Sequence, residues 1–154
     1  MSGRQPALRR WSKLQKQIYN LIDSRLDFQL HCRSYRMNSQ RGSTELPRYW
    51  IQIGGEMIWD YPRQFSSGLT YYPYQNDISA ISDLLREYID MPIVRLLDAR
   101  FENDRWGLTD ILKACDRRIS PNRLEAKFAE LSGTAQRVLH ARINHHGDAY
   151  RTAR

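Results

Sequence analysis

Residues 45–62 read ELPRYWIQIGGEMIWDYP, and this stretch decides the fold class because its pattern predicts a complete β-hairpin. Two runs of large residues, RYWIQI and MIWDYP, flank Gly54-Gly55. Both glycines accept the positive φ that a two-residue hairpin turn requires. We therefore predict two antiparallel strands, about 48–53 and 56–61, joined by this turn.

The predicted turn also sorts the side chains of the hairpin into two faces. It pairs Ile53 with Glu56 and, counting outward, Trp50 with Trp59, and side chains alternate between faces along a strand. The face predicted to lie in the core carries Tyr49, Ile51, Ile53, Ile58 and Asp60. The opposite face, which we call the aromatic interaction face, carries Arg48, Trp50, Met57, Trp59 and Tyr61, with Gln52. This second face is either covered by a helix or open to a partner, as a platform on which bases stack or as an apolar patch for protein association.

The flanking sequence predicts an α+β protein. A helix is expected from about 6 to 23, followed by a strand over about 26–37, where LDFQLHCRSYRM alternates apolar and polar residues. The polar segment 37–47, with Gly42 and Pro47, is predicted to be a loop. After a tyrosine-containing loop from 62 to 76, four to five C-terminal helices are expected to pack on this three-stranded antiparallel sheet, with helix caps at Asp77, Ser120 and Thr134.

Length and composition place limits on the class of protein. The 154 residues fit one globular domain, predicted over 1–154 with a frayed tail from about 145, and no internal repeat is found. No run of 18 apolar residues and no apolar segment behind the N-terminal charges occurs, which predicts a soluble cytoplasmic protein without a membrane partner. The two cysteines, Cys32 and Cys115, are typical of reduced structural thiols.

The charge is the largest departure from ordinary composition. Lysine and arginine number 24 against 17 acids, for a net charge of +7. Residues 1–48 carry +7, residues 49–105 carry −4 and residues 106–154 carry +4. This asymmetry indicates either basic patches for a polyanion or chain ends that pair with the chain's own middle.

The basic residues favour association with nucleic acid, without catalysis, as the leading function. They gather in the first helix and at a helical corner near residue 120, where a helix, a short turn and a second helix are expected. An ordinary helical hairpin gives the same pattern. The candidate nucleic-acid-binding residues are Arg9, Arg10, Lys13, Lys16, Arg117, Arg118, Arg123 and Lys127. The alternative function is a protein interaction or self-association through the aromatic interaction face.

A catalytic function finds little support in the sequence. The usual motifs of nucleotide binding, serine hydrolysis and zinc proteolysis are absent, so we predict no catalytic residues, no cofactor and no metal site. A third hypothesis, a metal-dependent enzyme, would use His31 and Asp60 across the sheet. It could instead use the C-terminal residues His140, His145, His146 and Asp148.

Overall fold

The computed structural model describes residues 10–39, 42–61, 80–102, 104 and 107–144, and it has the predicted α+β architecture. The N-terminal helix α1 (Trp11–Leu21) precedes an antiparallel sheet of β1 (Phe28–Ser39), β2 (Gly42–Ile53) and β3 (Glu56–Tyr61), in the order β1-β2-β3. The helices that follow are α2 (Ala80–Asp90), α3 (Ile93–Leu96), α4 (Leu108–Cys115), α5 (Pro121–Glu125), the 3₁₀ helix η1 (Phe128–Glu130) and α6 (Gly133–Asn144).

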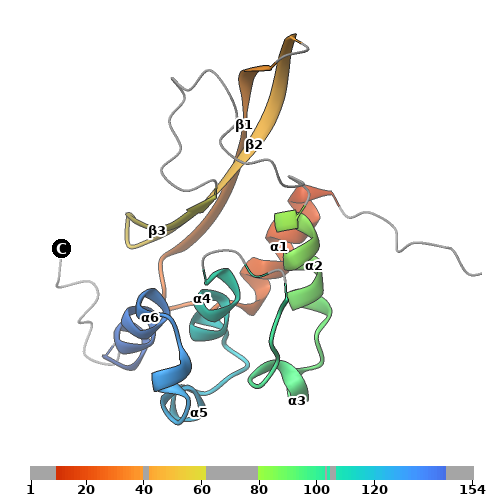
Figure 1. Cartoon of the computed structure of the whole chain (residues 1–154). Helices are drawn as coiled ribbons and strands as arrows, with labels where there is room; N and C mark the ends of the chain where they lie inside the picture. The colour runs from red at the N-terminus through yellow and green to blue at the C-terminus, as the bar shows by residue number, and fades with distance from the viewer. Residues whose placement is uncertain (1–9, 40–41, 62–79, 103, 105–106, 145–154) are drawn as a thin grey trace, which may run out of the picture.

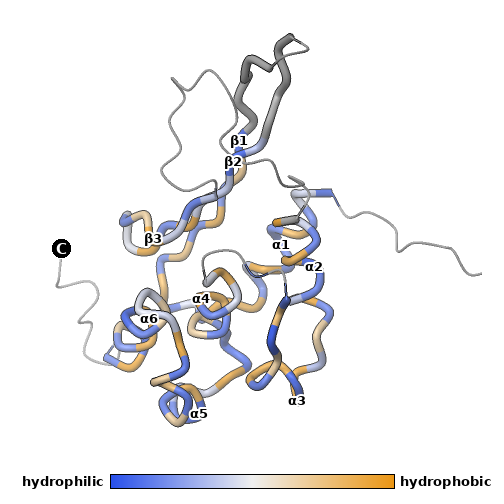
Figure 2. Tube along the Cα trace, in the orientation of Figure 1, coloured by the Kyte–Doolittle hydropathy of each residue, from blue (hydrophilic) through white to orange (hydrophobic). Residues whose placement is uncertain are grey.

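The helices gather on one side of the sheet, and the hydrophobic core lies between (Figure 1). In α1, Leu14 and Ile18 lie four residues apart, so they share one buried face. From the sheet, Leu30, Ile51 and Ile53 enter the same cluster. Figure 2 shows hydrophobic and hydrophilic stretches alternating along the helices, the pattern of helices that bury one face.

The Gly54-Gly55 turn is confirmed, but the pairing predicted beyond it is wrong. Both glycines have positive φ, 60° and 83°, and Ile53 pairs with Glu56 and Gln52 with Met57 as expected. The next pair is Ile51 with Trp59, so Ile58 is left out of the ladder in a β-bulge. Trp50 then faces Asp60, and Tyr49 faces Tyr61.

The bulge exchanges residues between the two predicted faces. Trp59 and Tyr61 turn into the core, where they are 5% and 1% exposed, although the regular register assigned them to the aromatic interaction face. Asp60 moves the opposite way, to the outer face beside Trp50. A single extra residue reverses the side of every later residue because side chains alternate strictly along a strand.

Deletion of Ile58 is therefore expected to leave the core register intact. Without it, Gln52–Met57 and Ile51–Trp59 become successive pairs, and Trp59 still points inward. We expect a loss of about 1–3 kcal/mol in unfolding free energy from the packing of the half-buried Ile58, measured by urea denaturation. Deletion of Asp60 is the matched control, because it turns Tyr61 outward and should cost more. If the Ile58 deletion unfolds the protein and the Asp60 deletion does not, the β-bulge at Ile58 is contradicted.

The polar segment predicted to be a loop is part of the sheet. β1 continues to Ser39 and β2 begins at Gly42, so residues 37–39 and 42–47 belong to strands. Two predicted helix caps also fall within the described residues. The Ser120 hydroxyl accepts a hydrogen bond from the Arg123 backbone N–H at 3.3 Å, as predicted, whereas the hydroxyl that caps α6 is that of Ser132, not Thr134, accepting from Ala135 N–H at 3.3 Å. Asp77 lies outside the described residues.

Cys32 and Cys115 are both free thiols, as expected. Cys115 is completely buried, and burial raises the pKa of the half-buried Cys32 thiol to about 11.

Among the helices in the described residues, none is both long and apolar enough to cross a membrane.

Candidate functional site

An exposed row of basic residues follows the outer side of α1. Lys13 and Lys16 lie three residues apart, so they are neighbours on one edge of the helix, and Arg10 is the residue that immediately precedes α1. All three are exposed, and Lys13 and Lys16 project from the side opposite the buried Leu14 and Ile18. Within the described part of the chain, none of the three forms an ion pair with a carboxylate.

Arg117 extends this row past the C-terminal end of α1. Its Nε donates to the carbonyl oxygen of Asn20 at 2.6 Å, and its backbone N–H donates to that of Leu21 at 2.7 Å. These carbonyls have no partner inside the helix, and the negative end of the helix dipole favours a cation there. Arg117 remains exposed. We call the four residues Arg10, Lys13, Lys16 and Arg117 the α1 basic row.

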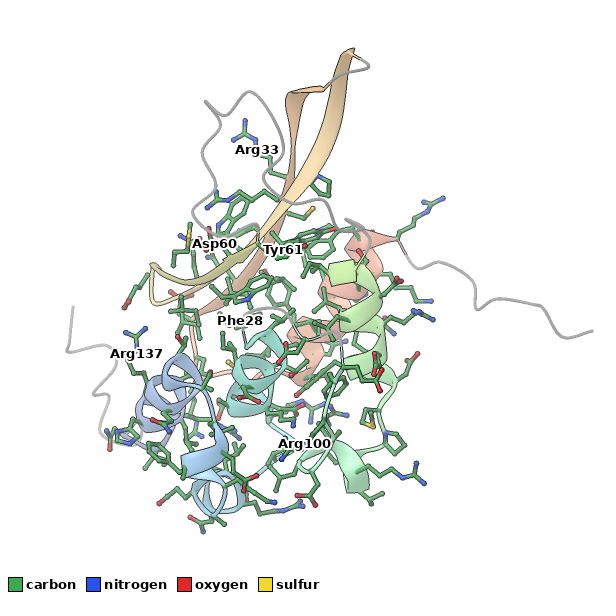
Figure 3. The ribbon with its side chains drawn as sticks, in the orientation of Figure 1. Phe28, Arg33, Asp60, Tyr61, Arg100 and Arg137 are labelled. Atoms are coloured by element: carbon green, nitrogen blue, oxygen red, sulfur yellow. The ribbon has the colours of Figure 1, made fainter. Side chains whose placement is uncertain are left out.

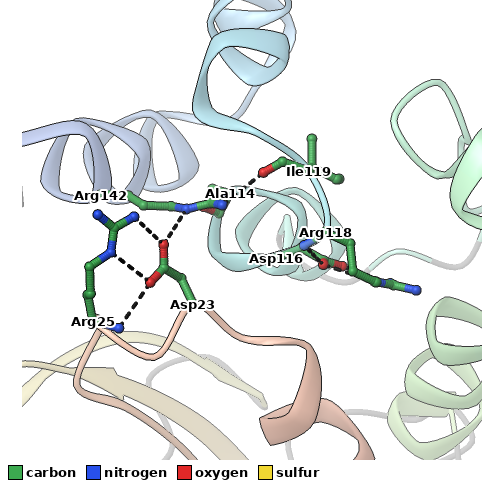
Figure 4. A network of polar contacts seen from close by, with 7 residues as sticks. All are labelled: Asp23, Arg25, Ala114, Asp116, Arg118, Ile119 and Arg142. Carbon is green, nitrogen blue, oxygen red and sulfur yellow. Dashed lines mark hydrogen bonds and ion pairs between the residues drawn. The ribbon is translucent and has the colours of Figure 1, made fainter.

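The ends of α1 and α4 are joined by two turns of the same construction. Ile22 and Asp116 form an antiparallel bridge, and Asp23 N–H donates to the carbonyl of Cys115 at 2.8 Å. In each turn an aspartate accepts three hydrogen bonds from the arginine two residues later. Arg25 donates through N, Nε and Nη2 to Asp23 at 3.0, 3.1 and 2.8 Å. Arg118 donates in the same way to Asp116 at 2.9, 3.0 and 2.8 Å (Figure 4).

The buried Arg142 of α6 stabilises this junction between the ends of α1 and α4 by hydrogen bonds to both sides. Its Nε donates to Asp23 at 2.9 Å, and its other nitrogens donate to the carbonyls of Ala114 at 3.2 Å and Ile119 at 2.8 Å (Figure 4). The hydrogen bonds from the Arg25 guanidinium, joined by that from Arg142, hold the pKa of Asp23 well below its usual range. The junction thus fixes Arg117 against the end of α1.

Sequence reasoning missed this junction, although a signal was present. The segments LIDSRL (21–26) and ACDRRI (114–119) share the order Asp, any residue, Arg, apolar residue. A third segment, LLDARF (96–101), has the same pattern. Its aspartate, Asp98, is exposed and pairs with Lys127 instead. The pattern alone therefore does not decide whether the turn forms.

The basic residues predicted at the helical corner do not form one basic patch, because two of them pair with acids. Arg118 is neutralised by Asp116, and Lys127 is 2.7 Å from Asp98 and 3.8 Å from Glu130. Arg123 is exposed, and Arg9 lies outside the described residues. The helix-turn-helix interpretation is wrong, because α5 has only five residues, too few for a recognition helix.

The outer face of the sheet keeps fewer aromatic residues than predicted. The ring of Trp50 lies 5.0 Å from that of His31 and 4.9 Å from the guanidinium of Arg48. Arg48 also lies 3.6 Å from both the Asp60 carboxylate and the Met57 sulfur. Because Trp59 and Tyr61 lie in the core and Trp50 is flanked in this way, the face lacks the row of open rings that a platform for stacked bases needs. Figure 3 shows Asp60 and Tyr61 on the sheet.

A polar cavity of about 540 Å³ lies between the segment after α3 and the helices α4 and η1. Lys113 at its wall is buried, and its Nζ donates to the carbonyls of Ala99 at 2.7 Å and Leu97 at 3.4 Å. Burial lowers the pKa of Lys113. These hydrogen bonds connect α4 with the segment after α3. This structural role is sufficient to explain the buried amine without a catalytic one.

Among the described residues, the candidate metal ligands are not brought together into a site. His31 and Asp60 share the outer face, contrary to the predicted sorting, but they belong to the two strands that flank β2, on either side of Trp50. His140 stacks on Phe128 at 5.2 Å. In the described ranges, no three His, Cys, Asp or Glu residues are grouped to hold a metal ion. His145, His146 and Asp148 lie outside those ranges.

Comparison with known proteins finds a match to a family model. The model of the SF0329 protein family matches residues 10–81, just under half of the chain. The matched part begins one residue before α1 and includes the whole sheet. No curated protein and no solved structure matches the chain.

Proposed function

We propose that this protein binds nucleic acid, without catalysing a reaction, through the α1 basic row. The observation that supports the proposal most is the exposure of Lys13 and Lys16 on one edge of α1, and of Arg10 just before it, without carboxylate partners among the described residues. By contrast, basic residues of the C-terminal segment 106–154 pair with acids of the acidic segment 49–105. Lys127 pairs with Asp98, and Arg137 pairs with Glu56. Among the residues that the structure describes, the charge of the α1 basic row is thus left for an external anion, which supports the proposal.

The spacing of the row suits a chain of phosphates. Residues three apart on a helix lie about 5–6 Å from each other, so each can meet a different phosphate of a strand that carries one charge per about 3.4 Å of its axis. Because each phosphate contact releases condensed counterions, such binding weakens steeply as salt rises. We also propose a cytoplasmic location, which suits the two free thiols.

The double variant Lys13→Gln/Lys16→Gln tests the proposal by fluorescence anisotropy with a labelled oligonucleotide across a salt series. The wild type is expected to bind at low ionic strength and to lose affinity as salt rises. In the variant, the slope of log affinity against log salt should fall by about 1.5–2, because two phosphate contacts are lost.

Arg95→Gln/Arg137→Gln is the matched control, since it removes the same charge from two exposed arginines on other elements. It should change the slope much less. An equal effect of both variants would show that only net charge matters, and wild-type binding that is absent at low salt would overturn the proposal.

A further inference from the structure

The hairpin of β1 and β2 extends far beyond the rest of the sheet. Each strand has twelve residues, but β3 pairs only with the segment of β2 from Tyr49 to Ile53. Beyond Tyr49 the sheet is a two-stranded ribbon of seven residue pairs, from Arg33–Arg48 to Ser39–Gly42. We call the strand segments 33–39 and 42–48, with the two residues between them in the sequence, the β-arm. In Figure 1 the two strand segments project past β3 and away from the helices.

Pro47 marks the base of the β-arm. It pairs with Ser34 of β1, two residues beyond the last pair between β2 and β3. Proline has no N–H to donate, so it is excluded from the middle of a sheet and tolerated where a strand has a neighbour on one side only. The chain thus carries a residue at position 47 that opposes continuation of β3 along the β-arm.

The composition of the β-arm differs from that of the buried part of the hairpin. Its sequence, RSYRMNSQRGSTELPR, holds four arginines and one glutamate, and about half of the remaining residues are Ser, Thr, Asn or Gln. Arg33 and Arg48 are direct partners across the two strands at its base. Like charges placed opposite each other destabilise a strand pair. Arg48 is close to Asp60. Arg33 is exposed and projects away from the helices (Figure 3).

The dimensions of the β-arm match a groove of duplex DNA. Seven pairs at about 3.3 Å per residue give a length of roughly 20 Å. The major groove of B-form DNA, about 12 Å wide and 8.5 Å deep, admits a two-stranded β-ribbon. The major groove of A-form RNA is too deep and narrow for side chains to read. Hydroxyl and amide side chains make many of the hydrogen bonds that proteins form with phosphates and bases.

We propose that the β-arm enters the major groove of double-stranded DNA, which deepens the proposed function and rests on it. The α1 basic row then supplies contacts to phosphates, and the β-arm supplies the preference for a B-form duplex. The net charge of +3 on the β-arm favours a polyanion over a second copy of this chain, whose β-arm would carry the same charge.

The test removes the β-arm without changing the register below it. Tyr35 and Leu46 are partners, so replacing residues 36–45 with Asn-Gly closes the ribbon by a two-residue turn at that pair. Anisotropy would be measured with a labelled DNA duplex of about 20 base pairs, the corresponding DNA single strand and an RNA duplex of the same length. The wild type is expected to prefer the DNA duplex by about tenfold or more. The shortened protein should lose that preference and retain salt-dependent binding.

A second variant, Arg33→Gln/Arg36→Gln/Arg41→Gln, keeps the backbone of the β-arm and should also lose the preference, so the test stands even if the shortened protein folds poorly. Equal binding of all three probes by the wild type, or an unchanged preference in both variants, overturns the inference and leaves the proposed function standing. Absence of any wild-type binding at low salt overturns both. A wild-type dimer that the shortening converts to a monomer in light scattering, with DNA affinity unchanged, assigns the β-arm to self-association and also overturns the inference.

Discussion

Replacing Arg142 with methionine is expected to lower the free energy of unfolding by about 3–5 kcal/mol, because the change removes one of the two guanidinium partners of the buried Asp23 and leaves two buried carbonyls without this donor. Arg142 is 3% exposed and contacts Asp23, Ala114 and Ile119. Methionine keeps much of the side-chain volume, so the loss would report the polar contacts more than a cavity. Urea denaturation followed by circular dichroism gives the value.

Two further variants separate the possible causes of this loss. Arg25→Ala removes the other guanidinium from Asp23, but the Arg25 side chain is 37% exposed, so we expect a loss of only about 1 kcal/mol. Asp23→Asn/Arg142→Met should recover part of the stability, since a neutral amide replaces the buried carboxylate that has lost one of its two guanidinium partners. Equal losses in Arg142→Met and Arg25→Ala would contradict a central role for Arg142.

Asp116→Ala is expected to cost a similar amount, about 3–4 kcal/mol, at the second turn of the junction. Asp116 is fully buried and accepts hydrogen bonds from Arg118 and from the Tyr88 hydroxyl at 2.7 Å. Burial, followed by the charge of Asp116, raises the pKa of Tyr88, so the hydroxyl stays protonated and needs an acceptor. Thermal and urea denaturation would measure the change.

Tyr88→Phe is the matched control for this prediction. It removes one hydrogen bond and leaves the Asp116–Arg118 pair in place, so we expect a loss of about 1 kcal/mol. A loss in Asp116→Ala no larger than that in Tyr88→Phe would mean that the arginine contributes little. It would also mean that the turn around Asp116 does not hold the junction together.

Local patterns predicted much of the fold. Apolar spacing in α1 identified Leu14 and Ile18 as its buried face, and by the same spacing Lys13 and Lys16 as its exposed one. Gly54 and Gly55 predicted the hairpin turn with its first two pairs. These features follow from residues close together in the chain, where helix and turn geometry leave few alternatives.

The two main errors have different origins, one in contacts between distant residues and one in the polarity of an exposed strand pair. The bulge at Ile58 lets Trp59 and Tyr61 enter a core that includes residues from the C-terminal helices, and nothing within the hairpin itself reports that core. The segment 37–47 was predicted to be a loop because it is polar, yet its backbone is paired strand against strand. Polarity indicates which segments are exposed, and an exposed ribbon is polar for the same reason as a loop.

The sequence by itself determined the order of helices and strands, the turn at Gly54-Gly55 and the basic outer edge of α1, because short-range periodicity and glycine conformation are encoded locally. Only the tertiary structure decided which charges remain exposed without a carboxylate partner. Asp98 and Asp116 neutralise Lys127 and Arg118, while the α1–α4 junction places the exposed Arg117 at the end of the α1 basic row. Pairing between charges depends on distances across the fold, and Asn20 and Arg117, which lie 97 positions apart in the chain, become neighbours only when α1 and α4 meet.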